Sequence, residues 1–120
     1  RLPIQYAFSF PQRLPLKGER LDLFKTQDLQ FFEPDYKKFK CLQLCFDAIR
    51  KGGNMSCIVN AANEIVNAGF RRGECGFLQM ADIIEEVMEK ATFDSQPDLD
   101  VYLQTDAEAR RIATELMHHI

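Results

Sequence analysis

The chain has 120 residues and a net charge of −3, with 18 acidic against 15 basic residues. A chain of this length suits one modest core, because such a domain buries roughly two thirds of the surface that its unfolded form exposes. The acidic balance argues against a nucleic-acid partner, and no run reaches the roughly 18 apolar residues of a membrane span. A signal-peptide layout is also absent, so we expect a cytosolic protein without a membrane partner.

The first 39 residues differ in composition from the rest. They hold four of the five prolines and six of the ten phenylalanines, and the chain opens on Arg1 rather than Met, so we expect a fragment of a longer protein. Proline spacing leaves room for one short helix near Pro3–Phe10 and a short extended piece at Leu29–Phe32. An aromatic arm without its own core should lie on another surface. Where that surface is missing, we expect the arm to be mobile or to pack against a second copy.

Helical periodicity begins at Phe39. One face of the first predicted helix of this region carries the apolar residues Cys41, Leu42, Leu44, Cys45, Phe46, Ala48 and Ile49. The pair Gly52-Gly53 should end this helix with a left-handed cap. The next helix is predicted from about Ser56 to Phe70, and Gly73 should close it in the same way.

Two further helices are predicted toward the C-terminus. One runs from about Leu78 to Ala91, with Met80, Ile83, Ile84, Val87 and Ala91 inward and a solvated acidic row of Asp82, Glu85, Glu86 and Glu89 outward. After a loop over Thr92–Leu103, the last helix should begin at Thr105, where Thr105 and Glu108 match a capping box. Its expected apolar stripe consists of Ala109, Ile112, Ala113, Leu116, Met117 and Ile120. The predicted fold is therefore all-α, a small bundle of about four helices preceded by a short helix and an extended arm rich in Phe and Pro.

The stretch Cys57–Asn67, CIVNAANEIVN, places an unusual number of polar residues in a predicted helix. On a helical projection Asn60, Glu64 and Asn67 share an exposed or partner-facing strip. Asn63 falls near the seam, where a partly buried amide would need hydrogen-bond partners. Glu64 with Asn60 could bind a cation or act as a base. Because no second carboxylate or His has a matching spacing, we favour a structural role in which Asn63 holds a neighbouring loop.

Other candidate ligands are few. The four cysteines, Cys41, Cys45, Cys57 and Cys75, are expected to be reduced and buried as small hydrophobic residues. Cys41 and Cys45 share a helix face and could chelate a metal, but zinc sites favour closer pairs and a second ligand pair. His118 and His119 are adjacent at a helix end, point in different directions and should be solvated. With no phosphate loop or nucleophile elbow present, we predict no catalytic, cofactor-binding or metal site in the chain.

Several short sequence motifs follow one another along the chain. They are Pro3–Ala7 (PIQYA), Pro11–Arg13 (PQR), Leu21–Leu23 (LDL), Phe32–Asp35 (FEPD), Ala48–Gly53 (AIRKGG) and Asn60–Glu64 (NAANE), followed by Phe70 and Phe77. In order and spacing they resemble the C-terminal part of the 1-deoxy-D-xylulose 5-phosphate reductoisomerase family, and NAANE is the most telling. The resemblance covers the whole chain. One departure is Lys40, where this family often carries Pro before the first bundle helix.

The resemblance implies a much longer parent enzyme, bacterial, cytoplasmic and homodimeric. It has an NADPH-binding Rossmann domain, a central catalytic domain and a C-terminal helical bundle reached through a linker. With Mg²⁺ or Mn²⁺, members of this family rearrange 1-deoxy-D-xylulose 5-phosphate and reduce the product to 2-C-methyl-D-erythritol 4-phosphate. This is the committed step of the non-mevalonate isoprenoid pathway.

The same resemblance implies a domain division within the chain. Residues 1–10 correspond to the last helix of the catalytic domain, 11–39 to the linker and 40–120 to the bundle. The family's NADPH, metal and phosphate ligands lie upstream of Arg1, so the chain is expected to be structural and inactive alone, with the rest of its own polypeptide as partner. Two alternatives are a free-standing helical interaction module and a small metal protein that uses Cys41 and Cys45.

Overall fold

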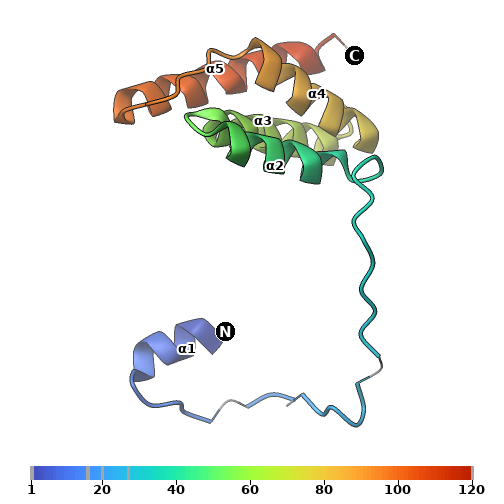
Figure 1. Ribbon diagram of the computed structural model, residues 1–120, viewed down its shortest axis with the longest axis vertical. Coiled ribbons are helices and arrows are strands. Elements are labelled where there is room, and N and C mark those ends of the chain that lie inside the picture. The colour runs from blue at the N-terminus through green and yellow to red at the C-terminus, as the bar shows by residue number, and fades with distance from the viewer. Residues whose placement is uncertain (1, 16, 20, 27, 120) are drawn as a thin grey trace. The chain divides into compact units, whose positions relative to one another are not determined.

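The computed structural model describes residues 2–15, 17–19, 21–26 and 28–119. These residues form five helices and no strand, namely α1 (Leu2–Ser9), α2 (Lys40–Lys51), α3 (Met55–Arg72), α4 (Phe77–Lys90) and α5 (Leu99–Met117) (Figure 1). The all-α prediction is confirmed. By its internal contacts the chain divides into two units, Arg1–Phe32 and Glu33–Ile120, and each is described by itself.

The N-terminal unit consists of α1 and an irregular arm. Pro3 stands in the first turn of α1, where its missing N–H has no helical partner to lose. None of the α1 residues is buried, and the arm leaves Phe24 and Phe31 almost fully exposed. The short extended piece predicted at Leu29–Phe32 forms no strand. As expected from the sequence, this unit has no hydrophobic core of its own among the described residues.

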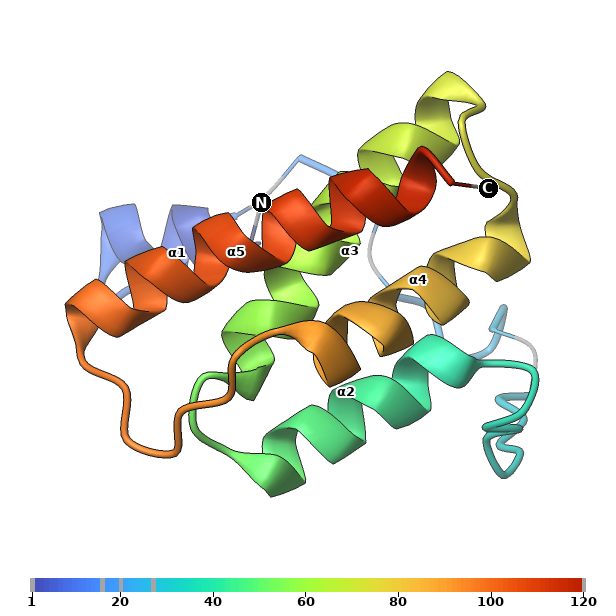
Figure 2. The same ribbon diagram turned by 90° about the horizontal axis from the view of Figure 1, so that it is seen from above.

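Helix α3 is the centre of the helical unit. It contacts α2, α4 and α5, and α4 also contacts α2 and α5. Figure 1 shows α2 and α3 in one layer and α4 and α5 in the other, and Figure 2 shows α5 running across α3. The largest fully buried side chains include Met55, Ile58, Val66 and Val87. All five residues predicted to face inward from α4 are buried, which confirms that prediction.

Glycine ends two of the helices. Gly73 follows α3 with the left-handed values φ 78° and ψ 19°, and its N–H donates to the carbonyls of Gly69 and Phe70, as predicted. Gly52 follows α2 with φ 71° and ψ −151°, so this cap is not the left-handed one predicted, and Gly53 has φ 55°. These positive angles suit glycine, because a Cβ is disfavoured there.

The start of α5 differs from the prediction. The helix begins at Leu99, and Asp98 caps it by accepting a hydrogen bond of 2.9 Å from the Val101 N–H to its Oδ1. The predicted loop over Thr92–Leu103 is therefore too long, and the predicted capping box at Thr105 was wrong. A Thr-x-x-Glu pattern is a local signal, whereas Asp98 supplies an equally good cap earlier in the chain. Thr105 instead lies inside the helix and is buried.

Helix α2 is attached to the unit along a narrow strip. Only Leu44 and Ala48 of α2 are buried, because α2 lies at an edge and, among the described helices, contacts α3 and α4. At its first residue, Lys40 Nζ forms ion pairs of 2.7 Å with Asp82 Oδ1 and with Glu85 Oε2 of α4. The acidic row of α4 is therefore partly an anchor for α2 as well as a solvated face.

Candidate functional site

The polar strip of α3 is exposed along its length. Asn60, Glu64 and Asn67 are exposed, as predicted. Asn63 is exposed too, and its side chain bonds to no described residue, so the expectation that it holds a neighbouring loop is not met. The physical reason is that α2 contacts the bundle through Leu44 and Ala48 and leaves the surface beside Asn63 open.

Glu64 is the ionisable residue of this strip, and its pKa is lowered from its ordinary value. Arg110 Nη2 donates to Glu64 Oε2 at 2.7 Å, and Arg110 Nε donates to Asp106 Oδ2 at 2.7 Å. Asn60 Nδ2 donates to the other Glu64 oxygen at 3.2 Å. The Arg110 guanidinium lowers the pKa of Glu64, with a smaller contribution from Asn60, and the two carboxylates raise the pKa of Arg110.

This geometry favours a structural role for Glu64. A carboxylate with a lowered pKa is a weak base, and Arg110 occupies the space between the two carboxylates that a cation would need. Within the described part of the chain, no group of three or more His, Cys, Asp and Glu side chains could hold a metal ion. The prediction that the chain contains no catalytic, cofactor or metal site stays a prediction.

A groove runs between α2 and α3 beside the polar strip. Its volume is about 340 Å³, and its wall includes Cys41, Cys45, Ile49, Ser56, Asn60 and Asn63. None of the residues that line it is charged. Partial burial, and to a lesser degree the neighbouring Cys45, raise the pKa of the Cys41 thiol, so this thiol is neutral at physiological pH.

The cysteines occupy three different environments. Cys41 and Cys45 are exposed, Cys57 is half-buried and Cys75 is buried at 8% exposure. The prediction that the thiols are buried holds fully only for Cys75, and Cys41 and Cys45 are exposed because they line the open groove between α2 and α3. Burial, and secondarily the Asp106 carboxylate, raise the pKa of Cys57. All four are free thiols.

Asn54 forms the most buried polar site in the helical unit. At 1% exposure, its Nδ2 donates to Thr92 O and to Thr105 Oγ1, both at 2.9 Å, and its Oδ1 accepts from Asp94 N at 3.0 Å. Glu108 extends the cluster by accepting from the N–H and the hydroxyl of Thr92, both at 3.1 Å. This site was not predicted from the sequence, where its one local signal is a polar residue directly after Gly52-Gly53. The cluster is fully bonded, so it stabilises the fold rather than offering reactive groups.

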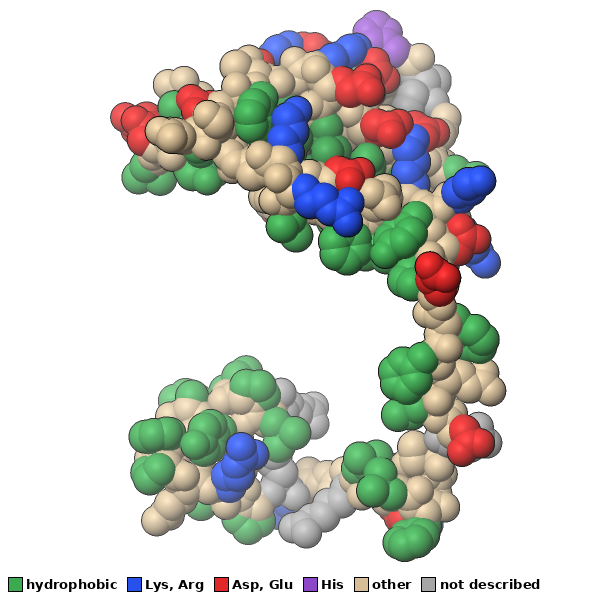
Figure 3. Space-filling view, viewed as in Figure 1, with side chains coloured by type: hydrophobic (Ala, Val, Ile, Leu, Met, Phe, Trp, Pro, Cys, Tyr) green, Lys and Arg blue, Asp and Glu red, His purple; other side chains and the backbone are tan. Residues whose placement is uncertain are grey.

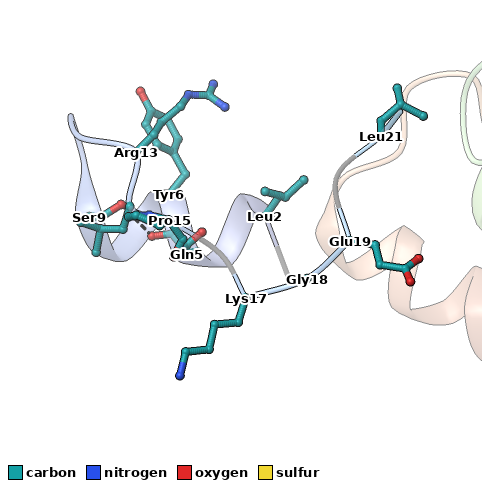
Figure 4. Close-up of a pocket in the computed structure, with 11 residues that line it drawn as sticks. Leu2, Gln5, Tyr6, Ser9, Arg13, Pro15, Lys17, Gly18, Glu19 and Leu21 are labelled. Carbon is teal, nitrogen blue, oxygen red and sulfur yellow. Dashed lines mark hydrogen bonds between the residues drawn. The ribbon is translucent and has the colours of Figure 1, made fainter. Parts of the chain in front are cut away.

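A second hollow lies in the N-terminal unit, between α1 and the segment that follows it (Figure 4). Its volume is about 610 Å³. Figure 4 shows Arg13 beside Tyr6, and the guanidinium carbon lies 4.9 Å from the ring centroid. Gln5 Nε2 donates to Pro15 O at 3.4 Å, and Ser9 Oγ donates to backbone carbonyls. These polar groups hold the loop against α1 and form no nucleophile and base pair.

The remaining predicted candidates lie at the surface. His118 and His119 are exposed at the end of α5. Ile120, predicted to belong to the apolar stripe of this helix, lies outside the described residues. Among the helices that the structure describes, none combines the length and the apolar composition that a membrane crossing requires.

A small helical unit whose polar clusters are bonded internally, preceded by an arm without a core, is typical of an accessory domain within a larger protein. Comparison with known families is consistent with this class. The chain belongs to the family of DXP reductoisomerase C-terminal domains, whose model matches residues 1–112.

Individual relatives share this assignment. The 1-deoxy-D-xylulose 5-phosphate reductoisomerase of Bacteroides thetaiotaomicron is 54% identical over 117 residues, which are 98% of this chain and 30% of the relative. That of Macrococcus caseolyticus is 44% identical over 108 residues, 90% of this chain and 29% of the relative. The chain therefore spans about 30% of the length of the curated relatives it matches.

Solved structures agree in fold. The Zymomonas mobilis reductoisomerase in complex with NADPH superposes with a TM-score of 0.83 at 36% identity, over 97% of this chain and 31% of that one. A DOX-P reductoisomerase in complex with NADPH, fosmidomycin and magnesium gives a TM-score of 0.86 at 28% identity, over 98% and 31%.

Proposed function

We propose that this chain is the C-terminal part of a 1-deoxy-D-xylulose 5-phosphate reductoisomerase. The proposed parent uses NADPH and Mg²⁺ or Mn²⁺ to convert 1-deoxy-D-xylulose 5-phosphate to 2-C-methyl-D-erythritol 4-phosphate, as a cytoplasmic homodimer in a bacterium. The observation that carries the proposal is the 54% identity over 98% of the chain to a protein of that name.

Within this parent, the chain has a structural role, and its partner is the rest of its own polypeptide. Residues 1–10 would end the catalytic domain, 11–39 would link it to the bundle, and 40–120 would form the bundle. A magnesium site needs several oxygen ligands that are free to bind the ion. The described side chains do not fit this requirement, because Arg110 forms ion pairs with both Glu64 and Asp106. NADPH and the metal would therefore bind upstream of Arg1.

The test compares three purified proteins, namely the parent, the parent ended before residue 40, and this 120-residue chain. NADPH oxidation is followed with substrate and metal. The parent should turn over, the shortened parent should lose most of its activity, and the isolated chain should show no rate above background. Turnover by the isolated chain would contradict the structural role. A parent without this activity, or an upstream reading frame without a nucleotide-binding fingerprint, would instead support a free-standing interaction module.

A further inference from the structure

Helix α2 exposes more apolar surface than the helical unit covers. Ile49 is 70% exposed, and Phe46 and Leu42 are about two fifths exposed. Figure 3 shows hydrophobic side chains exposed along the lower edge of the helical unit, the edge at which Figure 1 places α2. A contiguous apolar face on a domain this small is typical of a surface that another protein segment covers.

The groove beside this face has a defined chemistry. On its α2 side lie the thiols of Cys41 and Cys45 and the side chain of Ile49, and on its α3 side lie Ser56 and Asn63. None of the lining residues is charged, so the groove offers nothing to neutralise a phosphate or a carboxylate. An uncharged, largely apolar occupant fits it best.

Two amides at the groove are in different states. Asn60 is held by its bond to Glu64, which Arg110 holds in turn. Asn63 makes no side-chain hydrogen bond to any residue that the structure describes. A primary amide both donates and accepts, so Asn63 can bond the backbone of a segment that lies along the groove.

The relatives indicate where such a segment comes from. More than two thirds of the length of each matched relative lies outside the region that this chain covers. A bundle attached to so large a body is expected to bury part of its surface against it. The exposed apolar face of α2 borders the neutral groove, so a segment of this larger body can cover both together.

We propose that the α2 docking surface, meaning the groove together with Leu42, Phe46 and Ile49, binds an uncharged apolar segment of the parent polypeptide that lies outside this chain. This inference rests on the proposed function above. It adds which face of the bundle makes the contact and which side chains recognise the segment.

The native thiols test the proposal. In the 120-residue chain, Cys41 and Cys45 should react with N-ethylmaleimide, and in the parent their labelling should slow by about tenfold or more. Buried Cys75 is the internal control that stays slow in both proteins. A Glu89→Cys variant on the exposed side of α4 is the control that should label equally fast in both.

Each other outcome overturns the proposal and identifies its rival. Equal labelling of Cys41 and Cys45 in both proteins would show that the surface stays uncovered. Protection in the isolated chain that is lost on dilution would point to a second copy, and protection independent of concentration would point to this chain's own N-terminal unit.

A pair of variants supplies an independent measurement. Ile49→Asp should leave the Tm of the isolated chain nearly unchanged, since the side chain is 70% exposed, and should restore Cys45 labelling in the parent. Leu78→Asp, at 76% exposure on α4, is matched in exposure and should leave labelling unchanged. Labelling does not depend on turnover, so a parent that lacks reductoisomerase activity but protects these thiols would refute the proposed function and keep the docking surface.

Discussion

Asn54 and Thr105, 51 residues apart in sequence, share a buried hydrogen bond of 2.9 Å between Nδ2 and Oγ1. The same amide also bonds the backbone at Thr92 and Asp94. One side chain thus ties the start of α3 to the loop before α5 and to the interior of α5. Because this loop has no helical hydrogen bonds of its own, its path depends on side chains that bond its backbone, Asn54 and Glu108.

Replacing Asn54 should therefore be costly. Asn54→Ala leaves the Thr92 carbonyl and the Asp94 N–H without their partner, so we expect a loss of about 3 kcal/mol or more in the free energy of unfolding. Thr105→Val keeps the side-chain shape and removes one acceptor, so its cost should be about 1 to 2 kcal/mol. Urea denaturation of the 120-residue chain measures both. Equal and small effects would show that the buried network contributes little.

The adjacent glycines should differ in their tolerance of alanine. At Gly53, with φ 55°, a Cβ would collide with the carbonyl oxygen of Asp94 and approach Phe93 Cε2 at 3.0 Å. At Gly52, with φ 71°, a Cβ would meet no atom within 4 Å. Gly52→Ala should cost about 1 to 3 kcal/mol from backbone strain alone, and Gly53→Ala should cost clearly more. Thermal unfolding of the two variants makes the comparison, and the reverse order would contradict the packing of the loop against Gly53.

The true start of α5 can be checked through its cap. Asp98→Ala removes the acceptor of the Val101 N–H, so it should lower the free energy of unfolding by about 1 kcal/mol. Asp100→Ala removes an acidic residue from the same first turn without removing the cap and should cost less. If Asp100→Ala costs as much as Asp98→Ala, the stabilisation comes from charge near the helix end and not from capping.

The ion pair between Glu64 and Arg110 predicts a dependence on pH. Arg110 lowers the pKa of Glu64 below its ordinary value of 4.5, so the folded state favours the carboxylate. The stabilisation is present above pH 4.5 and is lost as the pH falls through the lower folded pKa. Glu64→Gln should therefore lower the Tm slightly at pH 7, and the difference from the unaltered chain should vanish once the pH falls below the folded pKa of Glu64.

Salt provides the control for this experiment. The side chains are partly open to solvent, so about 1 M NaCl should also shrink the difference at pH 7. A difference that persists at low pH and high salt would assign the effect of Glu64→Gln to packing or to its bond with Asn60.

The sequence predicted the buried face of α4 correctly and that of α2 poorly. Helix α4 packs against α2, α3 and α5, so the apolar residues that its helical periodicity predicted to face inward are buried. Helix α2 has an equally clear apolar period, yet most of its apolar face is exposed. Periodicity predicts which face of a helix is apolar, but it does not show whether another segment of this chain packs on that face.

The polar residues were harder for a different reason. The burial of Asn54 and the exposure of Asn63 depend on which distant segments reach them, and no local pattern carries that information. Thr105 and Glu108 matched a capping pattern but bond to Asn54 and Thr92 instead. These two side chains therefore form tertiary hydrogen bonds rather than the helix cap that the local sequence pattern predicts.

The narrow attachment of α2 also has a dynamic consequence. Leu44 and Ala48, with the two ion pairs of Lys40, fasten this helix to a unit whose other three helices enclose most of the core. Its backbone amides should therefore exchange with solvent deuterium through a local opening, while those of α3 exchange only when the whole unit unfolds. The outer helix can thus adjust its position by small amounts without disturbing the interior behind it.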